Sequence, residues 1–199
     1  MIFLQKFKHT GFALLIITSA CLILPVQGMT QVIVTGEDAY SYYENVSDEF
    51  RKQIEIAIPP KAFAPSVKPR KLLVLNLHVN NGQVLSGHGS IDYANYAIKL
   101  TGEKTGAYQA YFTRDTLVFK KEILNQFDAI CFNNTAGVLF EDEVLRQNLL
   151  DYIYSGKGFV GIHAAGATFV QYPVYDQFPE FGIMMGGYEN GGHPWMDHE

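Results

Sequence analysis

The sequence predicts an α/β domain, an open parallel sheet with helices on both faces. From Lys71 onward, short apolar runs alternate with segments of helical spacing. Several of these runs are continuously apolar, as expected of strands that are buried on both faces. Strands that alternate with helices imply right-handed crossovers and therefore a parallel sheet.

The individual elements follow from apolar spacing and from helix-end signals. The segment 141–158 has acids in its first turn and Gly156 at its end, which is typical of a helix. The segment "MMGG" (184–187) is interpreted as the end of another helix rather than as a phosphate cradle. Strands are predicted over 71–78, 108–115, 128–134 and 158–165, and helices over 91–106, 120–127 and 141–158.

The region before the sheet is divided in two. Residues 1–28 are predicted to be a signal peptide, because a basic start is followed by an apolar stretch and by small residues at Val26-Gln27-Gly28. The expected location is periplasmic or extracellular, with no stable membrane span after cleavage. An uncleaved anchor helix and a lipidated Cys21 are the alternatives. Residues 29–70 are a lead-in with one helix, capped by Ser47, and a Pro-rich spacer. The domain is expected over 71–199.

Composition excludes several classes of function. The formal charge of −5 argues against nucleic acid as a partner. No G-x-G-x-x-G or Walker pattern is present, so a nucleotide cofactor is not expected. The predicted domain holds one thiol, Cys131, in an apolar strand, so no disulfide is expected within it.

Polar residues follow the predicted strands at their carboxyl ends, which is where open parallel sheets bind ligands. Asn133 and Asn134 are interpreted as caps of a strand-to-helix loop, with ligand contact by one of them as the alternative. The residues proposed to contact substrate are Ser90, Asn134, Thr135 and His193, and those proposed for catalysis are His88 and His163.

His163 is the most informative of these residues. In "GFVGIHAAGA" a strand turns sharply into small residues and projects one side chain at its tip, as in a nucleophile elbow. A partly buried structural histidine is the alternative. If His88, His163 and His193 converge, their imidazoles could hold a divalent ion such as Zn²⁺ or Mn²⁺. Without metal, His163 is expected to act as a general base and His88 or His193 as a hydrogen-bond donor.

Five stretches together resemble the ThuA-like family, named for trehalose utilisation and related to class I glutamine amidotransferase domains. They are "PRKLLVLN", "HGSIDYANYAI", "FDAICFNNTAG", "GKGFVGIHAA" and "FGIMMGGYENGGHPW", over roughly residues 69–196. The resemblance implies a flavodoxin-like sheet with further strands beyond the "GHPW" segment, so the domain is expected to be incomplete at its C-terminus.

The resemblance also bears on function. It implies that His163 holds the position of the amidotransferase cysteine, so glutamine hydrolysis is not expected. It suggests an exported protein of carbohydrate catabolism that acts on or binds a small sugar or sugar derivative, with hydrolase- or lyase-like chemistry as a possibility. The family's acidic residue after the "HAA" segment is replaced here by Gly166, Ala167 and Thr168. A non-catalytic carbohydrate-binding or interaction module is therefore the alternative.

Overall fold

The computed structural model describes residues 41–171 and 177–189, which belong to the second of two units of the chain, Val32–Glu199. Its centre is a parallel sheet in which the strands lie in the order β4-β1-β5-β6. Numbered along the chain, this order is 2-1-3-4, which is the flavodoxin-like arrangement. The predicted α/β fold is therefore confirmed. The strands are β1 (Lys71–Leu75), β4 (Gln109–Thr113), β5 (Ala129–Asn133) and β6 (Gly158–Ile162).

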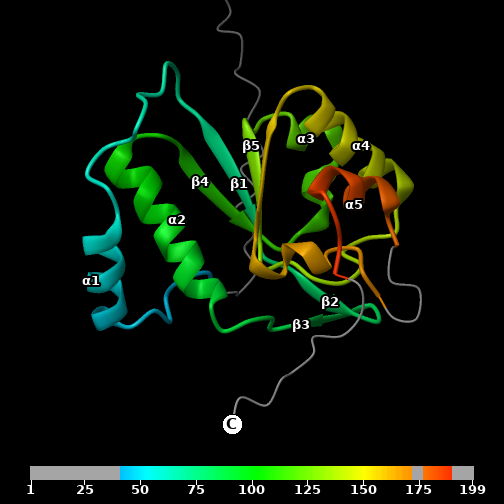
Figure 1. The fold of residues 1–199 in the computed structure, drawn as a ribbon, viewed down its shortest axis with the longest axis horizontal. Coiled ribbons are helices and arrows are strands. Elements are labelled where there is room, and N and C mark those ends of the chain that lie inside the picture. Colours follow the sequence, from blue (N-terminus) through cyan, green and yellow to red (C-terminus); the bar gives the residue numbers. More distant parts are fainter. Residues whose placement is uncertain (1–40, 172–176, 190–199) are drawn as a thin grey trace, which may run out of the picture. The chain divides into compact units, whose positions relative to one another are not determined.

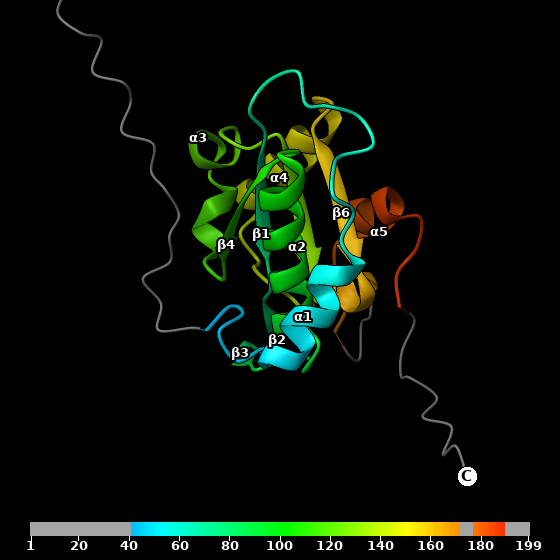
Figure 2. The ribbon, with the colours of Figure 1, turned by 90° about the vertical axis from the view of Figure 1, so that its left-hand side faces the viewer.

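Helices cover both faces of this sheet, as Figure 1 shows. The long helix α2 (Ile91–Thr105) lies on one face, and α1 (Asp48–Ala57) packs alongside it (Figure 2). The other face is covered by η1 (Thr116–Phe119), α3 (Lys121–Leu124), α4 (Glu143–Tyr154) and α5 (Pro179–Met185).

The main core lies between the sheet and α3, α4 and α5. Leu73 and Leu75 of β1 and Ile130 and Phe132 of β5 point to this side, because alternate residues of a strand share a face. Phe132 stacks on Phe181 of α5 at 5.7 Å between ring centroids. The remaining side chains of the same cluster come chiefly from η1, α4 and the segment after β6.

The opposite face carries polar residues where the strands end. Asn76, directly after β1, and Asn133, at the end of β5, both face α2 and are buried. Helix α2 presents Ile91, Asn95 and Gly102 to the sheet. A side chain at Gly102 would lie 2.5 Å from the Tyr108 carbonyl oxygen, so α2 approaches the chain before β4 closely there.

Two segments differ from the sequence-based expectation. The strand predicted over 71–78 ends at Leu75, and His78 begins a separate antiparallel hairpin, β2 (His78–Asn80) and β3 (Gln83–Leu85). The helix predicted over 120–127 is a single α-helical turn, α3, preceded by the 3₁₀ turn η1. In the first case the chain leaves the sheet because β2 pairs with Ala136 beyond β5 instead.

The strand β6 is not buried on both faces, which corrects another expectation. Phe159 packs against Phe132 and Phe181, but Val160 on the other face is 47% exposed. The physical reason is the position of β6 at the edge of the described sheet, where the described helices cover one of its faces. A continuous apolar run is therefore compatible with a half-exposed edge strand.

The lead-in contacts the domain. Ser47 caps α1 by accepting a hydrogen bond from the Phe50 N–H, as predicted. Phe50 meets Tyr93 of α2 edge-on at 5.0 Å, and Arg51 lies over the Tyr96 ring at 4.6 Å. The Pro-rich residues 59–70 form neither helix nor strand.

The predicted signal peptide lies outside the described residues. Within the described ranges, none of the helices combines the length and the hydropathy that a membrane crossing requires.

Candidate functional site

His163 lies at the tip of β6, where the chain turns sharply into the 3₁₀ helix η2 (His163–Ala167). Its φ of 53° is in the left-handed region, which costs a non-glycine residue about 1–3 kcal/mol. The turn keeps the residue exposed while Ala165 behind it is buried. The local geometry is therefore the strained strand-to-helix turn that the sequence pattern predicted.

His88 lies directly beside His163. Their ring centroids are 4.7 Å apart and the rings meet edge-to-face. His88 precedes α2, and its carbonyl oxygen accepts the N–H of Ile91, so the start of the helix positions it. The structure thus brings together two of the three histidines that we predicted to converge.

A third histidine, His78, lies near them in the hairpin, and no pattern in the sequence marks it as a site residue. Its ring centroid is 6.1 Å from that of His88, and its Nδ1 is buried without a hydrogen-bond partner. Burial lowers the pKa of His78, and the neighbouring His88 lowers it further. His78 is therefore held in its neutral form more strongly than a free imidazole.

Asn134 connects His163 to Ser90. The Oδ1 atom of Asn134 lies 2.7 Å from His163 Nδ1 and 3.4 Å from the Ser90 hydroxyl. Asn134 has a φ of 57°, so β5 and β6 both turn through the left-handed region at their carboxyl ends. The side chain is 1% exposed, which places its amide beneath the histidine rather than at the surface.

A row of buried amides continues from Asn134 into the space between the sheet and α2. Asn134 Nδ2 donates to Asn133 Oδ1 at 2.7 Å, and Asn133 Nδ2 donates to Asn95 Oδ1 at 2.8 Å. Asn95 Nδ2 then donates to the Tyr42 carbonyl at 2.9 Å and to Asn76 Oδ1 at 3.5 Å. Asn133 and Asn134 were interpreted as loop caps; their side chains belong to this amide row instead.

Thr135 lies under the turn. Its hydroxyl is fully buried and is 2.6 Å from that of Thr168, which also donates to the Thr135 carbonyl. Thr135 thus ties the end of β5 to the end of η2. Its contact with a substrate stays a prediction.

Of the three predicted metal ligands, the structure describes His88 and His163, whereas His193 lies outside the described residues. Within residues 41–171 and 177–189, no group of three or more His, Cys, Asp and Glu side chains is placed to hold a metal ion. The two imidazoles of His88 and His163 alone fall short of the three protein ligands that catalytic zinc sites use.

The site lies at the switch point of the sheet. In the strand order β4-β1-β5-β6, the connections from β1 and β5 leave in opposite directions, and ligands of such folds bind in the crevice at that point. Asn76 and the hairpin follow β1, whereas Asn133 ends β5 and Asn134 follows it. The histidines therefore stand where this fold class binds ligands.

A groove with a volume of about 780 Å³ lies along the other side of the hairpin. It combines apolar walls with charged and polar groups, a mixture suited to a polar small molecule. Its lining includes Val79, Arg114, Asp115, Leu139, Phe140 and Glu141. The sequence pattern does not indicate this groove, since its walls come from four separate segments.

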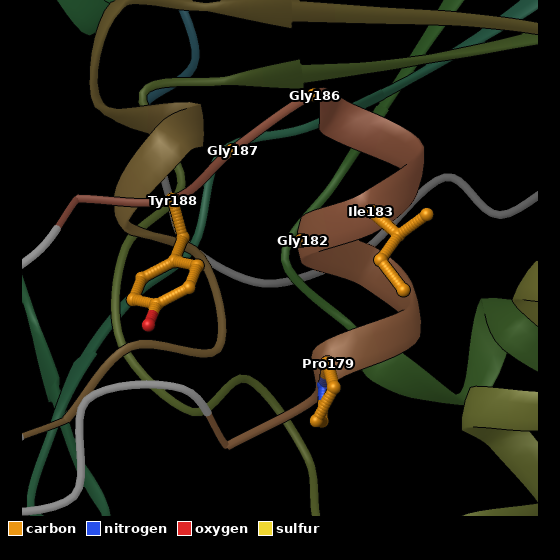
Figure 3. A pocket seen from close by; sticks show the side chains of 6 residues that line it. All are labelled: Pro179, Gly182, Ile183, Gly186, Gly187 and Tyr188. Carbon is orange, nitrogen blue, oxygen red and sulfur yellow. The ribbon is translucent and has the colours of Figure 1, made fainter.

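A second hollow lies at the end of α5 and does not include the predicted site residues (Figure 3). Helix α5 ends at Gly186, whose φ of 83° is left-handed, as the "MMGG" pattern predicted. The chain then passes η2, where the Glu189 N–H donates to the Gly166 carbonyl. The hollow is lined by Pro179, Gly182, Ile183, Gly186, Gly187 and Tyr188.

The chain is similar to proteins of one known family. The family model ThuA, described as trehalose utilisation, matches residues 76–198, more than half of the chain. A crystal structure of a ThuA-like protein from Bacteroides uniformis is similar at 20% identity and a TM-score of 0.44. That similarity covers 63% of this chain and 48% of the other, so the chain spans about half its length. No curated protein matches the chain. From the family match over residues 76–198, the chain belongs to the ThuA family.

Proposed function

We propose that this chain is an exported protein of carbohydrate catabolism that acts on a sugar or sugar derivative, with His163 as general base. The observation that carries the proposal is the placement of His163: an exposed imidazole on a strained turn, with Nδ1 bonded to a buried amide. The family description, trehalose utilisation, supports a sugar as the substrate class.

The acid–base work would rest on imidazoles. His163 Nδ1 is occupied by Asn134, so the opposite nitrogen, Nε2, is the one that can reach a sugar hydroxyl or an acidic C–H. His88, 4.7 Å away between ring centroids, is close enough to donate a hydrogen bond to the same ligand.

A metal ion would extend this chemistry. His88 and His163 would supply two imidazoles, and His193 is the proposed third ligand. A bound Zn²⁺ or Mn²⁺ would polarise a carbonyl or lower the pKa of a bound water. Metal analysis of the purified protein, with His163→Ala as the comparison, tests this part of the proposal.

Glutamine hydrolysis is not part of the proposed function. A glutaminase needs an accessible thiolate, and Cys131 lies buried within β5, where burial raises the pKa of its thiol to about 12. Ammonia release from glutamine is the measurement, and release that survives Cys131→Ala would contradict our interpretation of the turn at His163.

The second candidate function is a non-catalytic carbohydrate-binding module. The segment after His163 favours it, since Gly166 and Ala167 carry no acid and the Thr168 hydroxyl is used internally. This candidate predicts sugar binding without turnover.

The test combines binding and turnover on the full chain. Thermal shifts with a panel of sugars, with and without Zn²⁺ or Mn²⁺, identify a ligand. His163→Ala should abolish turnover of that ligand, whereas Lys121→Ala, an exposed change in α3, should leave it unchanged. Binding without turnover in the wild type would favour the binding module, and no response to any sugar would contradict both.

Export is tested separately. The proposed mature chain begins at Met29, which N-terminal sequencing of the exported protein would establish. A chain that still begins at Met1, or a lipid on Cys21, would contradict it.

A further inference from the structure

We propose that the row of buried asparagines fixes the tautomer of His163, with the proton on Nδ1 and the lone pair on Nε2. Asn133 and Asn95 then act as positioning residues that never touch the ligand. The inference rests on the proposed function only for its use in catalysis; the tautomer itself is a property of the folded chain.

Two backbone carbonyls anchor the row, and a carbonyl oxygen can only accept hydrogen bonds. The Tyr42 carbonyl lies 2.9 Å from one terminal atom of the Asn95 amide, so that atom is Nδ2. The Ile91 carbonyl lies 3.3 Å from one terminal atom of the Asn133 amide, which is likewise Nδ2. These two anchors set the orientation of both side chains.

Each amide then fixes the orientation of the next amide in the row. Asn95 must present Oδ1, which accepts from Asn133 Nδ2 at 2.8 Å. Asn133 in turn presents Oδ1, which accepts from Asn134 Nδ2 at 2.7 Å. Asn134 is left with Oδ1 toward His163, and the Ser90 hydroxyl donates to the same oxygen at 3.4 Å.

An oxygen that faces an imidazole nitrogen at 2.7 Å requires a proton on that nitrogen. His163 therefore carries its proton on Nδ1 when neutral, and Nε2 has the lone pair of a base or a metal ligand. Reversing any one amide would place oxygen against oxygen and N–H against N–H, and reversing all three would place Oδ1 of Asn95 and of Asn133 against the carbonyl oxygens of Tyr42 and Ile91. The three side chains are at most 1% exposed, so water would not compensate for those losses.

The row also links the lead-in to the site. Its far anchor is the Tyr42 carbonyl, and the Tyr42 and Tyr43 rings pack on Phe112 of β4 at 5.8 and 5.6 Å. The segment before the sheet thus contributes to the chemical state of a histidine at the end of β6.

The test is a two-bond ¹H–¹⁵N correlation spectrum of the ¹⁵N-labelled full chain, recorded at a pH where His163 is neutral. The wild type should show the proton on Nδ1. In Asn133→Leu the Asn134 amide loses its orienting partner, so a large fraction of His163 should change to the Nε2–H form. Asn148→Leu is the matched control, because Asn148 also donates to a backbone carbonyl, that of Phe119, but lies outside the row.

Asn134→Gly provides a second variant. Its φ of 57° suits glycine, so the turn should persist while the acceptor is removed. His163 should then show a mixture of both tautomers. An Nε2–H wild type, or unchanged tautomers in both Asn133→Leu and Asn134→Gly, would overturn the inference. The expected spectra in a protein that turns over no sugar would support the inference and contradict the proposed function.

Discussion

Replacing Gly137 by alanine should weaken the contacts that hold the hairpin β2–β3 and η2 against the segment after β5. Gly137 lies between the hairpin and η2, with a φ of 75°. Its N–H donates to the Ala167 carbonyl at 2.9 Å and its own carbonyl accepts from Phe169 N–H at 2.8 Å. A methyl group at this position would lie 1.7 Å from the Val79 carbonyl oxygen, a backbone atom that cannot move aside alone.

The magnitude follows from two contributions. A left-handed φ costs an alanine about 1–2 kcal/mol relative to glycine. Relieving the overlap with Val79 must move the hairpin away from the segment that holds Gly137. This movement breaks the two hydrogen bonds that join them, from the Val79 N–H to the Ala136 carbonyl and from the Ala136 N–H to the Leu77 carbonyl. Losing these two bonds costs about 1 kcal/mol each. The free energy of unfolding should therefore fall by about 3–4 kcal/mol, a large part of the 5–15 kcal/mol typical of a domain.

Urea denaturation measures this loss, and Gly82→Ala provides the control. Gly82 has the same φ of 75°, but a methyl group there would meet nothing within 4 Å. It should lose only the backbone contribution, about 1–2 kcal/mol. If the two variants differ by less than about 0.5 kcal/mol, which is the usual error of additivity, the steric argument at Gly137 is wrong.

Three further predictions concern titratable groups. Burial opposes ionisation of Asp128, but the Lys71 backbone N–H and neighbouring cations outweigh it and lower its pKa to about 2. Its carboxylate therefore stabilises the fold above its ordinary pKa of 3.8 and loses that effect as the pH falls toward 2. In Asp128→Asn, the free energy of unfolding measured with urea should depend less on pH over this interval than in the wild type. Burial and His88 lower the pKa of His78, so His78 binds a proton more readily in the unfolded chain than in the folded one. The melting temperature should therefore decrease as the pH is lowered from 6.5, and it should decrease less in His78→Gln. One of the two thiols, Cys131, should react with a thiol reagent only after unfolding, and rapid reaction in the native protein would contradict its burial.

Local signals predicted most of the elements. The helix expected over 91–106 is α2, Ile91–Thr105, and it ends at Gly106 in the left-handed conformation that glycine favours. Ser47 caps α1 as expected. Such signals succeed because capping and apolar spacing depend on residues within a few positions of one another.

The hairpin was also present in the sequence but was overlooked. Asn81-Gly82, with φ of 47° and 75°, is flanked by short β-prone segments, which is a standard hairpin signal. The exposure of Val160 in β6 is different in kind. A continuous apolar run does not indicate whether another element packs on the second face of the strand, so the run alone could not predict the exposure of Val160.

By itself, the sequence determined the alternation of strands and helices, the sharp turn at His163 and the position of polar residues at strand ends. Only the tertiary structure decided which of these residues meet. Asn95 faces Asn133 across the space between α2 and the sheet, and Tyr42 completes the row from a segment far earlier in the chain. A buried amide needs a partner, but the partner's identity depends on which elements the crossovers bring together. The pairing of His163 with Asn134 is for the same reason a property of the fold rather than of either segment.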